Sequence, residues 1–143
     1  PDIITKAAKL FGSQCVVVSL DAGVNQSDEY EVFIHFGTQP IGIGVVQWAK
    51  KVAECGAGEI LIQLIDKDGT LEGYDNRLNR IVSDAVEIPV LACSGAGSWK
   101  NFVDGFIEGG VAAVCTTNIY HFTESSIKSA KQFLRNARIE VRI

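Results

Sequence analysis

Short apolar runs alternate with segments of helical periodicity along most of this chain, and this alternation constrains the fold more than any other feature. Four apolar runs have the length of buried strands: residues 14–20, 59–65, 89–93 and 111–117. Before, between and after them, apolar residues recur at helical spacing, in residues 2–10, 45–54, 76–86, 99–108 and 125–136. The order predicts an α/β fold, with a parallel sheet joined by right-handed helical crossovers.

The chain has 143 residues, and we expect one domain over residues 1–143. Four parallel strands do not close a barrel, which needs eight. The pattern alone therefore leaves two architectures open, a small flavodoxin-like sheet and one half of a (βα)8 barrel. Residues 30–36 (YEVFIHF) alternate in polarity and are expected to form one arm of a hairpin.

Composition and charge exclude several classes of function. Hydrophobic residues make up 47% of the chain and charged residues 21%, as in ordinary folded domains. The net charge of −4 argues against nucleic-acid binding driven by overall charge. No apolar run approaches the roughly 18–20 residues of a membrane span, and no secretory signal pattern opens the chain. We therefore expect a cytoplasmic protein that binds neither nucleic acid nor membrane.

The cysteines Cys15, Cys55, Cys93 and Cys115 are far apart in the sequence and show no metal-type C-x-x-C spacing. We expect them to be buried, reduced thiols. The two histidines, His35 and His121, are too isolated to indicate a metal site. We expect neither a metal nor an organic cofactor.

Polar and glycine-rich segments follow each predicted strand. Because the carboxyl ends of parallel strands meet at one edge of a sheet, we expect these segments to build one site. Asp21 ends the first apolar run, where a carboxylate is partly removed from water and suits acid-base work. A cap for the following segment is an equally good reading of Asp21 alone.

Small residues at two neighbouring strand ends favour phosphate binding. Residues 94–97 (SGAG) precede a helix, so their backbone N–H groups can approach an anion at the helix N-terminus. Thr116, Thr117 and Asn118 lie at the end of the next strand; plain tight turns are the alternative for both segments. Residues 66–70 (DKDGT) carry two carboxylates, but the pattern of a calcium-binding loop is incomplete.

Four motifs in order resemble the cyclase subunit of imidazole glycerol phosphate synthase. They are CVVVSLDA (15–22), GAGEILIQLIDKDGTLEGYD (56–75), IPVLACSGAG (88–97) and TTNIYHF (116–122). The resemblance covers nearly all of residues 1–143 and implies the second half of a (βα)8 TIM barrel, that is, strands five to eight.

The resemblance implies an ammonia-dependent cyclase of histidine biosynthesis, a lyase that forms imidazole glycerol phosphate and aminoimidazole carboxamide ribotide. A partner glutaminase supplies the ammonia. Asp21 falls on one of the family's two catalytic aspartates, whereas the other lies in a strand that this chain does not contain. The loop with Asp66 borders the substrate, and the backbone of Gly69 helps to bind phosphate. Glu59 falls on a charged ring at the bottom of the barrel, where ammonia enters.

The resemblance also assigns substrate and phosphate binding to two strand ends. The residues concerned are Ser94, Gly95, Thr117 and Asn118. The partners expected are a phosphorylated small molecule, the glutaminase, and either a second copy of the chain or a complementary half-barrel.

Several departures from the family lie on the substrate side. Uncharged residues follow Ala22, where the family has basic ones. Gln63-Leu64 stands where the family has Thr-Ser, Cys93-Ser94 where it has Ser-Gly, and Asn118 where it has Ser. These changes resemble a divergent branch that amidates sugars of surface polysaccharides. A non-catalytic, self-associating half-barrel that binds phosphate is a further alternative, because its exposed strand edges would favour pairing.

Overall fold

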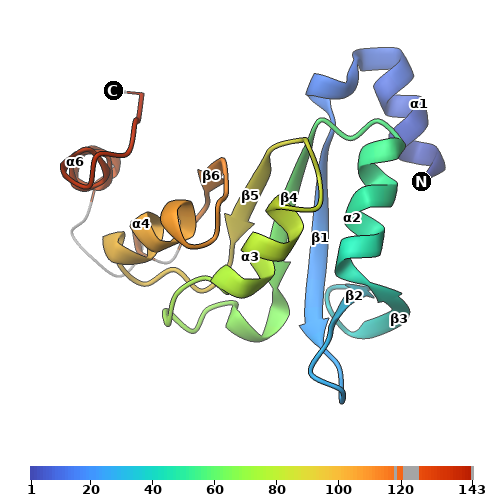
Figure 1. The fold of residues 1–143 in the computed structure, drawn as a ribbon, viewed down its shortest axis with the longest axis horizontal. Coiled ribbons are helices and arrows are strands. Elements are labelled where there is room, and N and C mark those ends of the chain that lie inside the picture. Colours follow the sequence, from blue (N-terminus) through green and yellow to red (C-terminus); the bar gives the residue numbers. More distant parts are fainter. Residues whose placement is uncertain (118, 121–125, 143) are drawn as a thin grey trace.

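The computed structural model describes residues 1–117, 119–120 and 126–142, and its strands form a single sheet (Figure 1). The strand order is β3-β2-β1-β4-β5-β6. The strands are β1 (Val17–Val24), β2 (Tyr30–Ile34), β3 (Gln39–Gly44), β4 (Glu59–Leu64), β5 (Val90–Cys93) and β6 (Ala113–Val114). The α-helices of these residues are α1 (Asp2–Phe11), α2 (Val45–Glu54), α3 (Asn76–Ser83), α4 (Trp99–Ile107) and α6 (Ile127–Asn136).

The order of the parallel strands decides between the two architectures that the sequence leaves open. Strands β1, β4, β5 and β6 pair in parallel and lie side by side in chain order. Because every right-handed crossover then steps in the same direction, α2, α3 and α4 cover one face of the sheet. A flavodoxin-like sheet reverses its strand order and carries helices on both faces. The predicted α/β fold of the TIM-barrel type, here a partial barrel, is confirmed.

Burial along β4 separates the two faces of the sheet. Ile60 and Ile62 are fully buried and Leu64 is nearly so, whereas Glu59, Leu61 and Gln63 are partly exposed. Side chains alternate along a strand, so the first set points to the helices and the second to the opposite side. We call that opposite side the inner face, because it would face the inside of a complete barrel.

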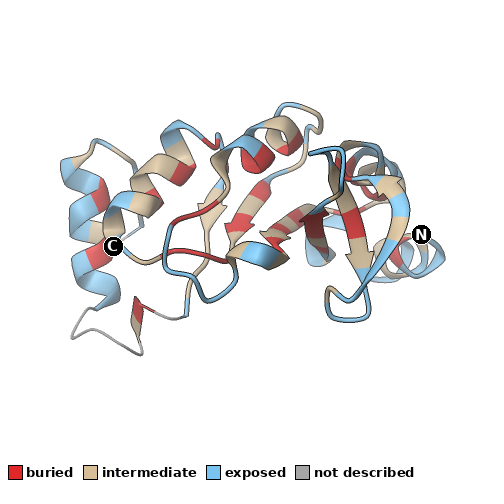
Figure 2. Ribbon diagram, turned by 90° about the horizontal axis from the view of Figure 1, so that it is seen from below, coloured by how far each residue is buried: buried red, intermediate tan, exposed pale blue. Residues whose placement is uncertain are grey.

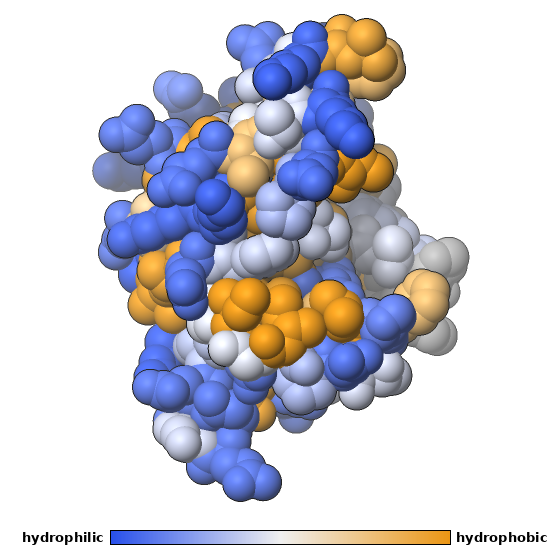
Figure 3. Space-filling view, turned by 90° about the vertical axis from the view of Figure 1, so that its right-hand side faces the viewer, coloured by the Kyte–Doolittle hydropathy of each residue, from blue (hydrophilic) through white to orange (hydrophobic). Residues whose placement is uncertain are grey.

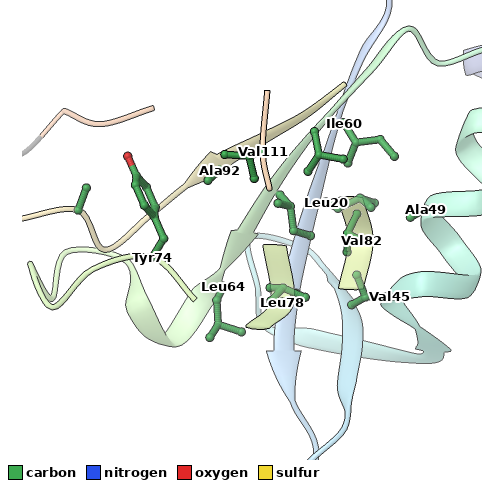
Figure 4. Packing of buried hydrophobic residues seen from close by; sticks show 14 of the residues in the cluster. Leu20, Val45, Ala49, Ile60, Leu64, Tyr74, Leu78, Val82, Ala92 and Val111 are labelled. Carbon is green, nitrogen blue, oxygen red and sulfur yellow. The ribbon is translucent and has the colours of Figure 1, made fainter. Parts of the chain in front are cut away.

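The hydrophobic core lies between the sheet and the helices (Figure 4). Val45 and Ala49 of α2, Leu78 and Val82 of α3, and Leu20 of β1 all belong to this core. Buried positions are concentrated on the strands and on the helix sides that face them, while the outer sides of the helices are exposed (Figure 2). This one-sided core holds the strand ends, and hence the site, in place.

The first strand differs from its prediction. It begins at Val17, since Ser13–Cys15 form a 3-10 helix, and it runs on to Val24. The expectation that Asp21 ends the strand is therefore wrong. The parallel ladder with β4 ends at Ala22, but β2 pairs antiparallel with residues 21–24 and prolongs the strand.

Two other strands also differ from expectation. The hairpin arm predicted over residues 30–36 is confirmed as β2, but its partner β3 was not predicted, because its sequence QPIGIG holds a proline and two glycines. The strand expected over residues 111–117 shortens to Ala113–Val114. Thr116 and Thr117 thus lie beyond β6 and can line a site.

The cysteines are all free thiols, but the expectation that they are buried is wrong for Cys15, which is exposed. Cys55, Cys93 and Cys115 are partly buried. Among the described residues, no helix combines the length and apolarity that crossing a bilayer requires.

Large apolar side chains remain exposed near the chain's first helix. Ile3, Leu10 and Phe11 of α1 are 78%, 74% and 66% exposed, and Val17 at the start of β1 is 52% exposed. The side of the molecule that carries α1, α2 and the hairpin shows apolar side chains gathered among hydrophilic ones (Figure 3). Gathered apolar side chains of this kind are typical of surfaces that contact another part of a protein.

Candidate functional site

Asp21 is held by a neighbour on the adjacent strand. The register of β1 and β4 places it opposite Gln63, whose Nε2 donates a hydrogen bond of 2.7 Å to Asp21 Oδ1. Within the described residues, Oδ2 accepts no hydrogen bond and the carboxylate joins no ion pair. The carboxylate is therefore oriented by one contact and keeps one oxygen available for proton transfer.

A row of polar side chains crosses the inner face at this level. Asp21 pairs with Gln63, and Gln63 pairs with Cys93 of β5. Neighbouring strands lie about 4.8 Å apart, so the row places Cys93 roughly 10 Å from Asp21. Asp21 and the end of β5 thus lie on one face and near one edge of the sheet.

A pocket of about 110 Å³ lies beyond the end of this row. We call it the strand-end pocket; its lining residues are Asp68, Cys93, Ser94, Gly95, Ala96, Cys115, Thr116 and Thr117. Segments that follow three successive parallel strands meet here. The structure brings together Ser94, Gly95 and Thr117, as expected, while Asn118 and His121 lie outside the described residues.

Backbone N–H groups are available in the pocket. Within the described residues, the N–H groups of Gly95 and Ala96 donate to no protein acceptor. The N–H groups of Gly97 and Ser98 are occupied, because Asn101 Oδ1 accepts from them at 3.0 and 2.9 Å. The free donors thus belong to the first half of the turn before α4, because Asn101 occupies the N–H groups of the two residues directly before the helix.

Ser94 has a structural hydroxyl. Its Oγ donates to the carbonyl oxygen of Leu64 at 3.0 Å and accepts from the N–H of Leu64 at 3.2 Å. The residue is 8% exposed and has a φ of 70°, a conformation rare for a residue with a side chain. This double hydrogen bond ties the turn after β5 to the end of β4, so Ser94 lines the pocket without offering its hydroxyl.

Gly95 fits where a side chain does not. A β-carbon at this position would lie 2.3 Å from the carbonyl oxygen of Gly73, and φ is 86°. The N–H of Gly73 also donates to the carbonyl oxygen of Gly95 at 2.7 Å. Close contact between the two loops therefore fixes the position of the free N–H groups.

The DKDG segment contributes a residue that was not singled out beforehand. Asp68 lines the pocket, whereas Asp66 is exposed in the 3-10 helix Ile65–Lys67 and does not line it. Gly69 occupies the following turn with a φ of 77°, also outside the lining. Both carboxylates of the motif are exposed to solvent, and they differ in that only Asp68 borders the pocket.

Glu59 lies at the other edge of the sheet. It begins β4 on the inner face, opposite Val17. At about 3.3 Å per residue, it lies roughly 13 Å along the strand from Gln63. The structure therefore separates Glu59 from the other candidate residues, at the edge where the strands begin.

The β2–β3 hairpin reaches the edge where the strands end. Tyr30 donates to both carboxylate oxygens of Asp75, at 3.0 and 2.9 Å, and the hypothetical β-carbon of Gly37 would lie 2.8 Å from Ile65 Cγ2. Burial, followed by the hydrogen bond to Asp75, raises the pKa of Tyr30 to about 12. The hairpin is thereby held beside the site by a hydrogen bond that persists at neutral pH.

The described residues contain no cluster of three or more histidine, cysteine or acidic side chains that could hold a metal ion. The chemistry available to them is proton transfer at Asp21, hydrogen bonding by Gln63 and anion binding by backbone donors. The pairing of Gln63 with Asp21 was not predicted, although both have the same position along neighbouring strands. Ala96 and Asp68 lie in segments that the sequence singles out, SGAG and DKDGT, but neither was assigned to the site by itself.

A sheet built from sequential βα units, with polar groups gathered where its strands end, is the arrangement of (βα)8-barrel proteins. Comparison with known families agrees with this class. The family model described as histidine biosynthesis protein matches residues 1–126. The chain belongs to this family of barrel proteins.

Proposed function

We propose that this chain is the C-terminal half of an ammonia-dependent cyclase barrel of the imidazole glycerol phosphate synthase type. In this proposal the strand-end pocket holds a phosphate group of the substrate and Asp21 transfers protons during ring closure. The second acid, and strands one to four, come from a complementary half-barrel.

The row from Asp21 through Gln63 to Cys93 carries the proposal. It connects an acid to a pocket with backbone N–H groups; among the described residues, one oxygen of the acid and two of these N–H groups have no partner. A separation of roughly 10 Å suits a substrate that is anchored by its phosphate at one end and reacts at the other. Backbone donors in a small pocket are a standard means of holding phosphate.

Gln63 would act as a positioning residue in this reaction. Its amide holds Oδ1 of Asp21, which leaves Oδ2 to accept or donate the proton. The Asp21 side chain thereby keeps one direction during turnover, as general acid-base catalysis requires.

The opposite edge of the sheet would receive ammonia. Glu59 lies there on the inner face, and a glutaminase bound at this edge would deliver ammonia through the inside of the completed barrel. The exposed Val17 and the apolar side chains of α1 would be covered by the complementary half.

The divergent sugar-amidating branch is the second candidate. The Gln63–Asp21 hydrogen bond favours it, because a long amide at this position changes the groups that face the substrate next to the acid. Turnover with the cyclase substrate separates the two candidates.

The experiment mixes this chain with a complementary half-barrel of the family and measures ammonia-dependent formation of the imidazole product. We expect turnover in the mixture and its loss with Asp21→Asn, while substrate binding persists. Glu54→Gln, on the exposed side of α2, serves as the control with unchanged turnover. Unchanged turnover with Asp21→Asn would remove this residue from the mechanism.

A further inference from the structure

Cys93 and Cys115 lie side by side on the inner face of the sheet. The parallel pairing of β5 with β6 matches Ala92 with Val114, and the N–H of Cys115 donates to the carbonyl oxygen of Ala92 at 2.8 Å. The next residue of each strand therefore occupies neighbouring positions and points to the same side. Both thiols line the strand-end pocket, and both are partly buried.

The electrostatics of the two thiols agree with this proximity. Burial raises the pKa of Cys93, and it also raises the pKa of Cys115. The neighbouring Cys93 raises the pKa of Cys115 further. Both groups thus stay protonated at neutral pH, and each alone is a poor nucleophile compared with an exposed thiol.

The spacing of the strands favours a bridging atom over a direct bond between the sulfurs. A disulfide needs β-carbons about 3.8 Å apart, whereas neighbouring strands with parallel side chains hold them about 4.8 Å apart. A single atom that bonds to both sulfurs can bridge this wider separation of the β-carbons, so the backbone need not move. The described residues contain no cluster of three metal ligands, so these residues by themselves do not provide the ligand set of a tetrahedral zinc site.

We propose that Cys93 and Cys115 form a paired-thiol site that binds a trivalent organoarsenical through both sulfurs. This chemical class needs only two thiols, because the arsenic keeps its organic substituent as the third. With an arylarsine oxide, two S–H bonds and the arsenic–oxygen bond break, two arsenic–sulfur bonds form, and one water leaves. No atom changes its oxidation state. The site does not depend on the proposed function.

The experiment treats the folded chain with phenylarsine oxide, adds an excess of a monothiol, and measures the intact mass under non-reducing conditions. A monothiol removes arsenic from a single cysteine but not from a bridged pair. We expect one resistant adduct per chain in the native sequence. We expect none in Cys93→Ser or Cys115→Ser, while Cys15→Ser and Cys55→Ser retain it as matched controls.

A second measurement needs no variant. Cleavage after Arg80, Lys100 and Lys128 places Cys93 in residues 81–100 and Cys115 in residues 101–128. Tryptic digestion of the adduct should therefore yield these two peptides joined through one phenylarsenic group, and a dithiol should separate them. An adduct that the monothiol removes, or a bridge that joins any other pair of cysteines, would overturn the proposal.

Discussion

Replacing Tyr30 by Phe tests how the hairpin is held against the edge where the strands end. The hydroxyl of Tyr30 donates to both oxygens of Asp75, and Asp75 also caps α3 by accepting from the N–H of Leu78 at 2.7 Å. Tyr30→Phe removes the first contact and leaves the second. Asp75 therefore keeps a partner, and the hairpin loses one of its contacts with α3, since Arg77 still pairs with Asp28 and lies over the aromatic ring.

The expected magnitude follows from the charge and exposure of this pair. A hydrogen bond to a charged group contributes about 1.5–3 kcal/mol. Tyr30 is partly exposed, so we expect Tyr30→Phe to lower the free energy of unfolding by about 1–2 kcal/mol at pH 7. Denaturation with guanidinium, followed by the fluorescence of Trp48 and Trp99, measures the difference.

The pH dependence gives a second signature. The pKa of Tyr30 is raised from 10.0 to about 12 in the folded chain, first by burial and then by Asp75. The folded state thus holds this proton more tightly than the unfolded state. The stabilisation is fully present below pH 10 and is lost as the pH rises through 12. The gap between native chain and variant should be constant from pH 7 to 9 and should shrink between pH 10 and 12.

Tyr120→Phe is the matched control at pH 7, because the hydroxyl of Tyr120 makes no hydrogen bond to a described residue. We expect a change within about 0.5 kcal/mol for this control. A Tyr30→Phe variant whose free energy of unfolding at pH 7 equals that of the native chain would contradict a stabilising Tyr30–Asp75 hydrogen bond. A difference in unfolding free energy that does not shrink above pH 10 would contradict the raised pKa of Tyr30.

Two further predictions concern the strand-end pocket. Gly95→Ala places a β-carbon 2.3 Å from a backbone carbonyl oxygen, and we expect it to lower the free energy of unfolding by more than about 2 kcal/mol in chemical denaturation. Gly12→Ala is the control, because Gly12 has the same φ of 86° but open space around it; we expect a loss of about 1 kcal/mol. Equal losses would contradict the close packing of the two loops. Asp68→Asn removes a negative charge from the pocket, so we expect inorganic phosphate to bind about three- to tenfold more tightly in calorimetry. Asp66→Asn, outside the pocket lining, should leave phosphate binding unchanged. A stronger effect at Asp66 would instead favour the role first assigned to it.

Much of the fold could be predicted because local periodicity and core burial agree. The alternation along β4 is also the alternation between helix-facing and inner side chains. The hairpin arm β3 could not be predicted, since Pro40, Gly42 and Gly44 disfavour a strand and only pairing with β2 stabilises it. The extension of β1 past Asp21 has the same cause, because it depends on a partner strand.

The site was predicted less completely, because its details depend on contacts between distant segments. Gly95 and Thr117, which the motifs single out at neighbouring strand ends, both line the pocket. They could not distinguish Asp68 from Asp66, since a short 3-10 helix sets which carboxylate faces the pocket. They also could not show that Asn101 occupies the N–H groups of Gly97 and Ser98, which leaves those of Gly95 and Ala96 as the donors without a partner among the described residues.

The one-sided core has a consequence for how this protein can change. The even-numbered positions 60, 62 and 64 of β4 are buried against the helices, whereas the odd-numbered positions 59, 61 and 63 lie on the inner face. Core packing and inner-face chemistry are thus encoded on alternate residues of a single strand. A substitution at an odd position can therefore change the inner face while the packing underneath stays intact.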